Sequence, residues 1–512
     1  MHSEEKVAVG VAALYVANIA TLAFNTLFLV LLTNALRTTA EVGLVSLLNL
    51  VVVGAATLSV LALPVTGAGV AATPPAVTRF LSEYIRDGLS SARRVYFASL
   101  AICGAVSMTV FLVLAYWPVP AFLAGPADGP VAFFAGVDAV VFSFGQLGAY
   151  AMLGAGKATG AGKAIVVSSV ARYAIASAFL FSGSGPSGVF IGFAIGDSLL
   201  AVLTNASAAG AVQHLVKPGP SMRPVRNYMA SVFFAAVMGL AVSQTDKLLA
   251  FFQQGLGNLA VYNVATVGAA VASFAPSAAT NVLVPALSSY SDRDRKKEML
   301  RRYTRYISLT AIPTGFALAA VSPFLLRIFG EAYVSGWPLL SVVAISISFS
   351  SIASVYSASL LVDDRAHHFT LSTLAALAVL VLVSLTTVPV VGLLGIAIAR
   401  GAMLLSMTAA VAFFVHRSGM LVLDSLAYLK SLGASAAMAL LVFLALSVGQ
   451  REGLSSRGAT VASAVVMLPA GLLVYLLIMK ALKGFNQTDM DFVDTLLPRS
   501  MRFVSRLARK LL

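Results

Sequence analysis

The sequence predicts an all-α polytopic membrane protein with about fourteen transmembrane helices. The chain of 512 residues is 59% hydrophobic and only 11% charged, whereas soluble domains carry roughly 25% charged residues. Its apolar residues gather into fourteen long stretches. Each run is close to the ~20 residues that an α-helix needs to cross a hydrocarbon core of about 30 Å. A membrane β-barrel would instead alternate polar and apolar residues.

The expected spans follow from these runs in chain order. The first run is longer than the core of a signal peptide and lacks a clear cleavage site, so we expect a retained helix there. The connections on one side are short and rich in Gly, Ser and Pro, and none is long enough for a folded domain. The spans are expected at residues 8–32, 44–72, 96–117, 131–153, 164–182, 189–213, 228–250, 259–287, 307–327, 338–361, 370–390, 393–415, 431–449 and 459–480.

Three segments outside the spans have an amphipathic pattern. Residues 73–95 and 288–306 are expected to form short helices that lie against the membrane surface, and Ser291 with Asp294 has the form of a capping box for the second helix. In the tail, Pro498–Leu512 places its basic side chains on one side of a helix and its apolar side chains on the other. Such a helix is typical of an interfacial segment on an anionic leaflet, although a solvated basic tail is the alternative.

The distribution of charge predicts the orientation of the chain. The formal net charge is +14, but the basic residues gather in alternate connections, which indicates membrane topology rather than a nucleic-acid partner. The connections on the other side hold only Arg37, Arg327, Arg451 and Arg457. The positive-inside rule therefore places both termini in the cytoplasm of a multi-pass protein of the cell (plasma) membrane. The single cysteine, Cys103, excludes an internal disulfide and is expected to be buried.

Two short motifs recur at nearly the same separation. Ile191–Ile195 in the sixth span matches Leu394–Ile398 in the twelfth, and Pro75–Phe80 after the second span matches Pro285–Tyr290 after the eighth. Both pairs lie six spans apart in the same orientation, which predicts two parallel six-helix repeats with a site at their interface. The predicted domains are 1–215 and 216–418 for the two bundles, 419–480 for helices 13 and 14, and 481–512 for a cytoplasmic amphipathic tail.

Several stretches resemble the polysaccharide-flippase branch of the multidrug/oligosaccharidyl-lipid/polysaccharide exporter superfamily. The seventh span carries adjacent Asp246 and Lys247, followed by a short outer turn. The eighth span begins with a pattern in which Val261 stands where the branch usually has Gly. The matching stretches are Ser243–Leu249, Leu256–Ala265, Thr39–Leu44 and Thr78–Tyr84.

This resemblance covers essentially the whole chain, and fourteen spans agree with it. It implies two six-helix bundles around a central cavity that opens alternately to either face. It also implies that the protein is a flippase, which moves a polyprenyl phosphate- or pyrophosphate-linked oligosaccharide from the inner to the outer leaflet. The alternative is a Na⁺- or H⁺-coupled multidrug or metabolite exporter of the same superfamily. The expected partners are the lipid-linked glycan, membrane lipids and glycan-assembly enzymes.

Basic residues inside the spans are candidates for binding a lipid head group. A charge at mid-bilayer costs at least about 2.5–3.5 kcal/mol on insertion scales, so each one needs a reason. Arg172, Lys247 and Arg400 are the candidates, because cationic side chains can accompany a phosphate across the membrane and the planar guanidinium fits phosphate well. The alternatives are an ion pair of Asp197 with Arg172 or Arg400, and a snorkelling pair of Asp246 and Lys247 near the outer end of the seventh span.

Acidic and amide side chains supply the other candidates. Asp138, Asp197 and Asp246 are candidates for binding a coupling proton or Na⁺. Asp197 and Arg400 each follow the glycine of their repeat motif, Gly192 or Gly395, by five residues. Candidate polar residues lining the cavity, which helix–helix hydrogen bonding would explain equally well, are Asn18, Asn25, Asn263 and Asn281.

An enzyme is the least favoured alternative. Asp292 and Asp294 have the D-x-D form found in many glycosyltransferases, but they sit among basic residues at a helix start. Asp363 and Asp364, near His367 and His368, have no further ligand at suitable spacing, so a solvated turn is preferred to a metal site. We therefore expect no catalytic residue, metal or cofactor, and no direct use of ATP.

Overall fold

A computed structural model describes residues 2–60, 75–116, 129–218, 220–274, 292–362, 366–451 and 456–486, with three single positions between 275 and 291. Within these residues the secondary structure is helical apart from one isolated bridge. Twelve of the described helices are long and apolar enough to cross a membrane, and the Ile19–Ala35 part of the first helix is a shorter apolar segment. The predicted all-α membrane fold is confirmed.

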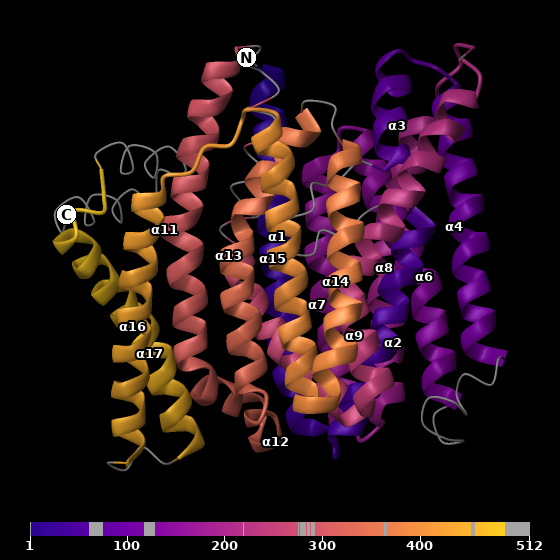
Figure 1. The fold of residues 1–512 in the computed structure, drawn as a ribbon. Coiled ribbons are helices and arrows are strands. Elements are labelled where there is room, and N and C mark those ends of the chain that lie inside the picture. The colour runs from indigo at the N-terminus through magenta and orange to yellow at the C-terminus, as the bar shows by residue number, and fades with distance from the viewer. Residues whose placement is uncertain are drawn as a thin grey trace. The chain divides into compact units, whose positions relative to one another are not determined.

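Figure 1 shows the order of the elements along the chain. Their bounds are α1 His2–Ala35, α2 Thr39–Val60, α3 Ala76–Arg86, α4 Ser91–Tyr116, α6 Gly129–Gly154, α7 Ala158–Phe181, α8 Gly185–Val212, α9 Arg223–Ala269, η2 Ala270–Ser273, α11 Arg293–Leu325, η3 Leu326–Phe329, α12 Glu331–Val334, α13 Trp337–Val362, α14 Ala366–Val391, α15 Leu393–Arg417, α16 Ser425–Arg451 and α17 Arg457–Ala481.

Helix α9 contains the seventh predicted span and the beginning of the eighth. Its backbone is helical on both sides of Gly255, which itself has φ 81° and ψ 178°. Essentially only glycine adopts this conformation, so the turn predicted between the seventh and eighth spans is a break at one residue. With α1 included, the structure agrees with about fourteen membrane helices.

The contacts divide the described residues into two compact units. The first extends to Ala260 and the second begins at Val261. Most of α9 therefore belongs to the first unit, in which Gly54 of α2 lies against Leu240. The predicted boundary at residue 215 concerns internal repetition rather than contacts, and it stays a prediction.

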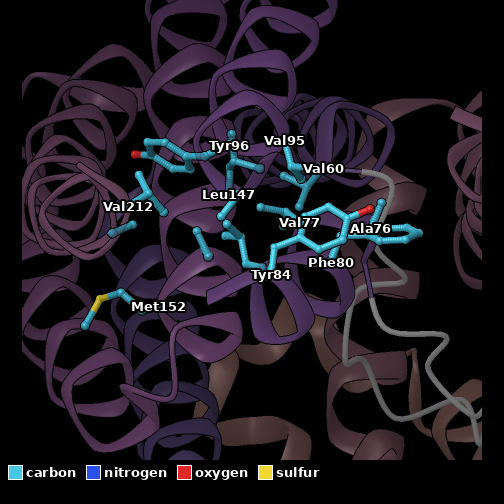
Figure 2. Close-up of a cluster of buried hydrophobic side chains, with 14 of the residues drawn as sticks. Val60, Ala76, Val77, Phe80, Tyr84, Val95, Tyr96, Leu147, Met152 and Val212 are labelled. Atoms are coloured by element: carbon cyan, nitrogen blue, oxygen red, sulfur yellow. The ribbon is translucent and has the colours of Figure 1, made fainter. Parts of the chain in front are cut away.

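In the first unit, α3 covers the ends of α4 and α6. Its apolar side chains, including Val77, Phe80 and Tyr84, are buried in a cluster with Leu147 of α6 and Val212 of α8 (Figure 2). The protein itself therefore covers the apolar face of this helix, and its predicted place against the membrane surface stays a prediction. Arg79 and Glu83 occupy the exposed side.

The turn between α3 and α4 forms hydrogen bonds with residues 217–220, which connect α8 to α9. Leu89 forms a parallel bridge with Lys217, and the amide of Ser90 donates to the carbonyl of Lys217 at 2.7 Å. The Ser91 hydroxyl donates to the carbonyl of Pro220 at 3.0 Å. The start of α9 is also attached, since the ring of Tyr228 lies 4.5 Å from the Arg79 guanidinium. The connection between the predicted repeats is thus fastened to the first unit.

In the second unit, α11 begins outside the apolar region and continues into it without a break. Its N-cap is Asp292, whose side chain accepts from the amide of Asp294. The capping box predicted at Ser291 is therefore wrong by one residue, since a carboxylate serves the helix start as well as a hydroxyl does. Residues from 293 are the first turns of a long helix rather than a separate surface helix.

Helices α16 and α17 pack on α11, and polar contacts attach them at several levels. Tyr475 donates to the carbonyl of Leu309 at 3.1 Å and shares a 3.0 Å hydrogen bond with Ser431. At one end of α11, the Arg305 guanidinium pairs with Asp424 and donates to the carbonyl of Gly484. The two helices beyond the predicted repeats are therefore integral to the second unit.

Candidate functional site

Three consecutive helices of the first unit bring Asp138, Arg172 and Asp197 together. These residues lie on α6, α7 and α8, and α8 packs against both of the other helices. The approach of α7 and α8 depends on glycine. A Cβ at Gly196 would overlap the backbone of Arg172, and a Cβ at Gly192 would overlap that of Ala176. Asp197, the residue after Gly196, can therefore reach Arg172 directly.

The guanidinium of Arg172 lies between the two acids. Its Nη1 donates to Asp197 Oδ2 at 2.7 Å, and its Nη2 lies 3.8 Å from Asp138 Oδ2. Nη2 also donates to Asn49 Oδ1 of α2 at 3.3 Å. The exposed fraction of the side chain is 10% for Arg172, 4% for Asp197 and 0% for Asp138. The sequence alternative of an ion pair between Asp197 and Arg172 is present in the structure.

Aromatic rings cover the same guanidinium. Its carbon lies 4.0 Å from the ring centroid of Phe193, 5.1 Å from that of Phe142 and 5.8 Å from that of Tyr173. A cation over an aromatic face gains more when both are desolvated. The rings therefore offset part of the cost of burying Arg172.

A second layer of polar contacts extends the network to α1. Tyr173 donates to Asn25 Oδ1 at 3.3 Å, and one turn from these residues the hydroxyls of Thr21 and Ser169 are 3.0 Å apart. Five helices (α1, α2, α6, α7 and α8) thus contribute polar side chains to this region of the first unit, which is buried at the two acids and Arg172 and part-buried towards α1 and α2.

The charges of this network do not balance. One guanidinium faces two carboxyl groups, and neither oxygen of Asp138 has a hydrogen-bond partner among the described residues. Burying a carboxylate without hydrogen bonds is costly. Asp138 also interacts electrostatically with Asp197, and the repulsion between two carboxylates adds to the cost of keeping both of them charged. The geometry therefore suits one exchangeable proton or small cation at Asp138.

The other predicted site residues lie elsewhere. Asp246 and Lys247 are on α9 in the first unit, where Asp246 is buried and Lys247 half-buried. Arg400 on α15 and Asn263 belong to the second unit, and both are half-buried. The side chain of Asn18 and all of Asn281 lie outside the described residues. Their predicted roles in binding a head group, an ion or a sugar stay predictions.

Sequence reasoning missed Asn49, Phe142 and Phe193. Asn49 is an amide inside the otherwise apolar α2, and that isolated polar residue was a usable signal. The two phenylalanines gave none, because they are indistinguishable from other apolar residues of a membrane helix. Two further buried amide oxygens, of Gln244 and Gln253, have no hydrogen-bond partner among the described residues of α9 or its neighbours.

The structure describes part of the residues in the weaker enzyme motifs. Asp292 of the D-x-D motif is the N-cap of α11. His367 and His368 contact each other, and His368 stacks on Phe414 with a centroid distance of 4.3 Å. Asp363 and Asp364 lie outside the described residues, within which no group of three or more His, Cys, Asp or Glu side chains is placed to hold a metal.

Comparisons with known proteins agree with this fold. The model of a polysaccharide biosynthesis protein family matches residues 87–337. No curated protein matches the chain in sequence. Among solved structures, the chain is similar to the lipid II flippase MurJ in its inward closed conformation, with a TM-score of 0.61 and 15% identity over 91% of this chain and 98% of that one.

Two other solved transporters have a similar fold. One is an inward-facing multidrug resistance MATE family transporter, with a TM-score of 0.57 and 19% identity over 78% of this chain and 95% of that one. The other is a transporter from Pyrococcus furiosus, with a TM-score of 0.53 and 18% identity over 80% of this chain and 96% of that one. The chain therefore has the fold of these polytopic membrane transporters. The family match over residues 87–337 agrees with the resemblance to the multidrug/oligosaccharidyl-lipid/polysaccharide exporter superfamily.

Proposed function

We propose that this transporter flips a lipid-linked oligosaccharide from the inner to the outer leaflet. The observation that carries this proposal is the match of residues 87–337 to a family of polysaccharide biosynthesis proteins. The similarity to MurJ supports it, because it covers 91% of the chain against 78% for the MATE transporter. That difference is comparable to the length of Ser425–Ala481, the two helices attached to α11.

In this proposal, the cationic side chains Lys247 and Arg400 bind the phosphate or pyrophosphate of the lipid. Both are half-buried, and Arg400 sits on α15 at the position that corresponds to Asp197 in the repeat motif. Arg172 was predicted for the same role, but here Asp197, Asn49 and three rings engage its guanidinium. It can meet a head group only in a state in which the pair with Asp197 is open.

The unbalanced acid of the first unit supplies a way to couple transport to an ion gradient. When Asp138 binds a proton or Na⁺, the group formed with Arg172 and Asp197 changes from a net charge of −1 to zero. A change of one buried charge alters the relative stability of two conformations substantially, because desolvation penalises unpaired charge. The proposed coupling site is therefore separate from the proposed head-group ligands.

A reconstituted flipping assay tests the proposal. The full-length protein is placed in proteoliposomes with a fluorescent polyprenyl-pyrophosphoryl oligosaccharide, and the lipid that becomes accessible to an external quencher is measured. Arg400→Ala should abolish flipping, whereas Arg37→Ala, which changes an exposed arginine, should not. Wild-type flipping by a stably inserted Arg400→Ala variant would remove Arg400 from the mechanism, and no flipping by the wild-type protein would refute the proposed substrate.

The alternative function is a Na⁺- or H⁺-coupled exporter of drugs or metabolites, which the buried acids also favour. Gradient-dependent export of a cationic dye, lost in Asp197→Asn, would support it over the flippase. We place the protein in the plasma membrane with both termini in the cytoplasm, as the charge distribution predicts. Glycan-assembly enzymes are then its expected partners on that side.

A further inference from the structure

A basic surface lies in the first unit, where the turn between α3 and α4 meets the connection from α8 to α9. Residues 86–94 and 213–226 together hold six basic residues and one acid, which is a formal charge of +5. All six basic side chains are exposed. The basic residues are Arg86, Arg93, Arg94, Lys217, Arg223 and Arg226, and the acid is Asp87.

Hydrogen bonds between the two segments bring these charges together. The amide of Ser90 donates to the carbonyl of Lys217 at 2.7 Å. The guanidinium of Arg94 spans both segments, because its Nη2 donates to the carbonyl of Pro220 at 3.4 Å. The side chain of Lys217 lies over the turn, with its Nζ 3.9 Å from the position that a Cβ would take at Gly88. The cations of the two segments therefore belong to one surface.

Most of this positive charge is not neutralised within the protein. The one acid, Asp87, lies 3.4 Å from Arg86 in an exposed pair, which contributes little in water. Four of the cations form no ion pair among the described residues, namely Arg93, Lys217, Arg223 and Arg226. Like charges on one surface repel each other, so the surface favours an anionic partner.

Exposed apolar side chains adjoin the cations. Phe97 of α4 is 48% exposed, and the guanidinium carbon of Arg93 lies 5.8 Å from its ring centroid. Val216, directly before Lys217, is 85% exposed. From Phe97 onward α4 continues as a candidate membrane span, most of whose side chains are not buried. Basic and apolar side chains together suit the boundary between lipid head groups and acyl chains, where both kinds are accommodated.

This surface differs from the apolar face that the periodicity of residues 73–95 predicts for membrane contact. Val77, Phe80 and Tyr84 of α3 point into the buried cluster (Figure 2). The apolar face of α3 is therefore occupied by the protein. The side chains that remain available to lipid come from the turn after α3, from the start of α4 and from the connection to α9.

We propose that this basic surface binds the anionic head groups of membrane phospholipids, with Phe97 and Val216 at the boundary to the acyl chains. The lipids that fit are those with a phosphate and a net negative charge, such as phosphatidylglycerol, rather than zwitterionic phosphatidylcholine. With the orientation that the charge distribution predicts, these lipids belong to the inner leaflet. The inference does not depend on which substrate the protein transports.

Fluorescence quenching at one position tests the proposal. The full-length protein carries Val216→Cys labelled with a fluorophore, and the native cysteine, Cys103, is buried, so labelling is selective for the exposed thiol. The protein is reconstituted in phosphatidylcholine vesicles that contain a trace of spin-labelled phosphatidylglycerol or of spin-labelled phosphatidylcholine. The ratio of quenching by the two lipids measures the preference of this surface for an anionic head group.

Quenching by phosphatidylglycerol should be the stronger of the two at low salt. Lys217→Gln and Arg93→Gln should each lower the preference by a factor of about five, which is the contribution of one basic residue near an anionic leaflet. Lys217→Arg should keep it. Lys163→Gln, the matched control, should leave it unchanged, because Lys163 is an exposed lysine of the same unit on the same predicted side. Added salt should reduce the preference through screening.

Three results would overturn the proposal. Equal quenching by the two lipids would show membrane contact without recognition of the anionic head group. Absence of quenching by either lipid would place the surface in the aqueous phase and favour an acidic soluble partner. An equal loss of preference in Lys163→Gln and Lys217→Gln would mean that the total charge of the protein, rather than this surface, attracts the lipid.

Discussion

Asp138 is fully buried in α6, and its nearest cation, Arg172, already has a closer partner. The 2.7 Å contact of Arg172 with Asp197 and the 3.8 Å contact with Asp138 differ by more than an ångström. The two acids should therefore respond differently to substitution. One is the hydrogen-bonded partner of the cation, and the other is a surplus carboxyl group.

Asp138→Asn should leave the thermal midpoint of the detergent-solubilised protein unchanged or raise it, because the amide keeps the shape and removes the unbalanced charge. Asp197→Asn should lower the stability by about 1.5–3 kcal/mol, since it removes a buried charged hydrogen bond. Thermal unfolding of both variants by intrinsic fluorescence checks this. Equal losses in the two variants would show that the acids share the cation evenly.

Gly196 gives a second test at the same place. Gly196→Ala should destabilise the first unit by about 1–3 kcal/mol, because the added methyl group meets the backbone of Arg172 and must push α7 and α8 apart. Gly210→Ala in the same helix is the control, since its methyl group would meet nothing within 4 Å. A Gly196→Ala variant as stable as Gly210→Ala would contradict the tight contact of these helices.

The sequence predicted which side chains of this cluster are chemically unusual, because a charge inside an apolar run is visible without a structure. It could not predict which of them meet. The sequence allowed two ion-pair partners for Asp197, Arg172 and Arg400. Only the close packing of α7 on α8 at Gly192 and Gly196 shows that the partner is Arg172. The covering rings of Phe142 and Phe193 were invisible for a similar reason, since every membrane helix contains such residues.

At the scale of elements, α16 and α17 are attached through charged contacts at the basic end of α11. Asp424 accepts from the amide of Ala427 and pairs with Arg305, which also donates to the carbonyl of Gly484. Partial burial alone would raise the pKa of Asp424. The hydrogen bonds from Ala427 and Arg305 outweigh that effect, so the pKa lies below its usual value.

A lowered pKa means that this carboxylate stabilises the folded state above the pKa of the unfolded chain, about 3.9. Its contribution is lost as the pH falls through the lower pKa of the folded state. Asp424→Asn should therefore be less stable than the wild type at pH 7 by about 1–3 kcal/mol, and the difference should shrink below about pH 4. Melting curves of both proteins between pH 3 and pH 7 measure it, and a difference independent of pH would contradict the ionic contact.

The surface segments show where periodicity stops being informative. The pattern of residues 73–95 correctly indicates a helix with one apolar face, and α3 is that helix. Periodicity does not say whether lipid or protein covers the face, because both are apolar. Only the positions of α4, α6 and α8 reveal that Phe80 and Tyr84 are buried in the protein.

For the molecule as a whole, runs of apolar residues and the alternation of charge were sufficient to predict an all-α membrane fold with about fourteen spans. These patterns could not predict which of the two compact units α9 packs against. Residues of α9 up to Ala260 contact the first unit, although the repeat pattern assigns them to the second half. Contacts between helices depend on the conformation of a transporter, whereas repetition is fixed in the sequence.

Gly255 is the position at which the helix direction changes within α9. Gly255→Ala should destabilise the protein by about 1–3 kcal/mol, because φ 81° with ψ 178° is available essentially to glycine alone. Gly433→Ala, at a helical position with nothing within 4 Å of the added methyl group, should be neutral. Thermal midpoints and flipping rates of the two variants check this, and a neutral Gly255→Ala would mean that the break is not required.

The bridge between Leu89 and Lys217 restricts which parts of the backbone can bend during a transport cycle. The connection from Lys217 to the start of α9 is held by hydrogen bonds from Ser90 and Ser91 and by the contact of Tyr228 with Arg79, so it is not a flexible linker. In the transport that we propose, bending of the backbone is then expected further along the chain, at the glycine break at 255, where α9 leaves its regular helical path. Inserting residues into the segment around Lys217 would therefore weaken its attachment to the first unit and would not increase the range of motion of α9.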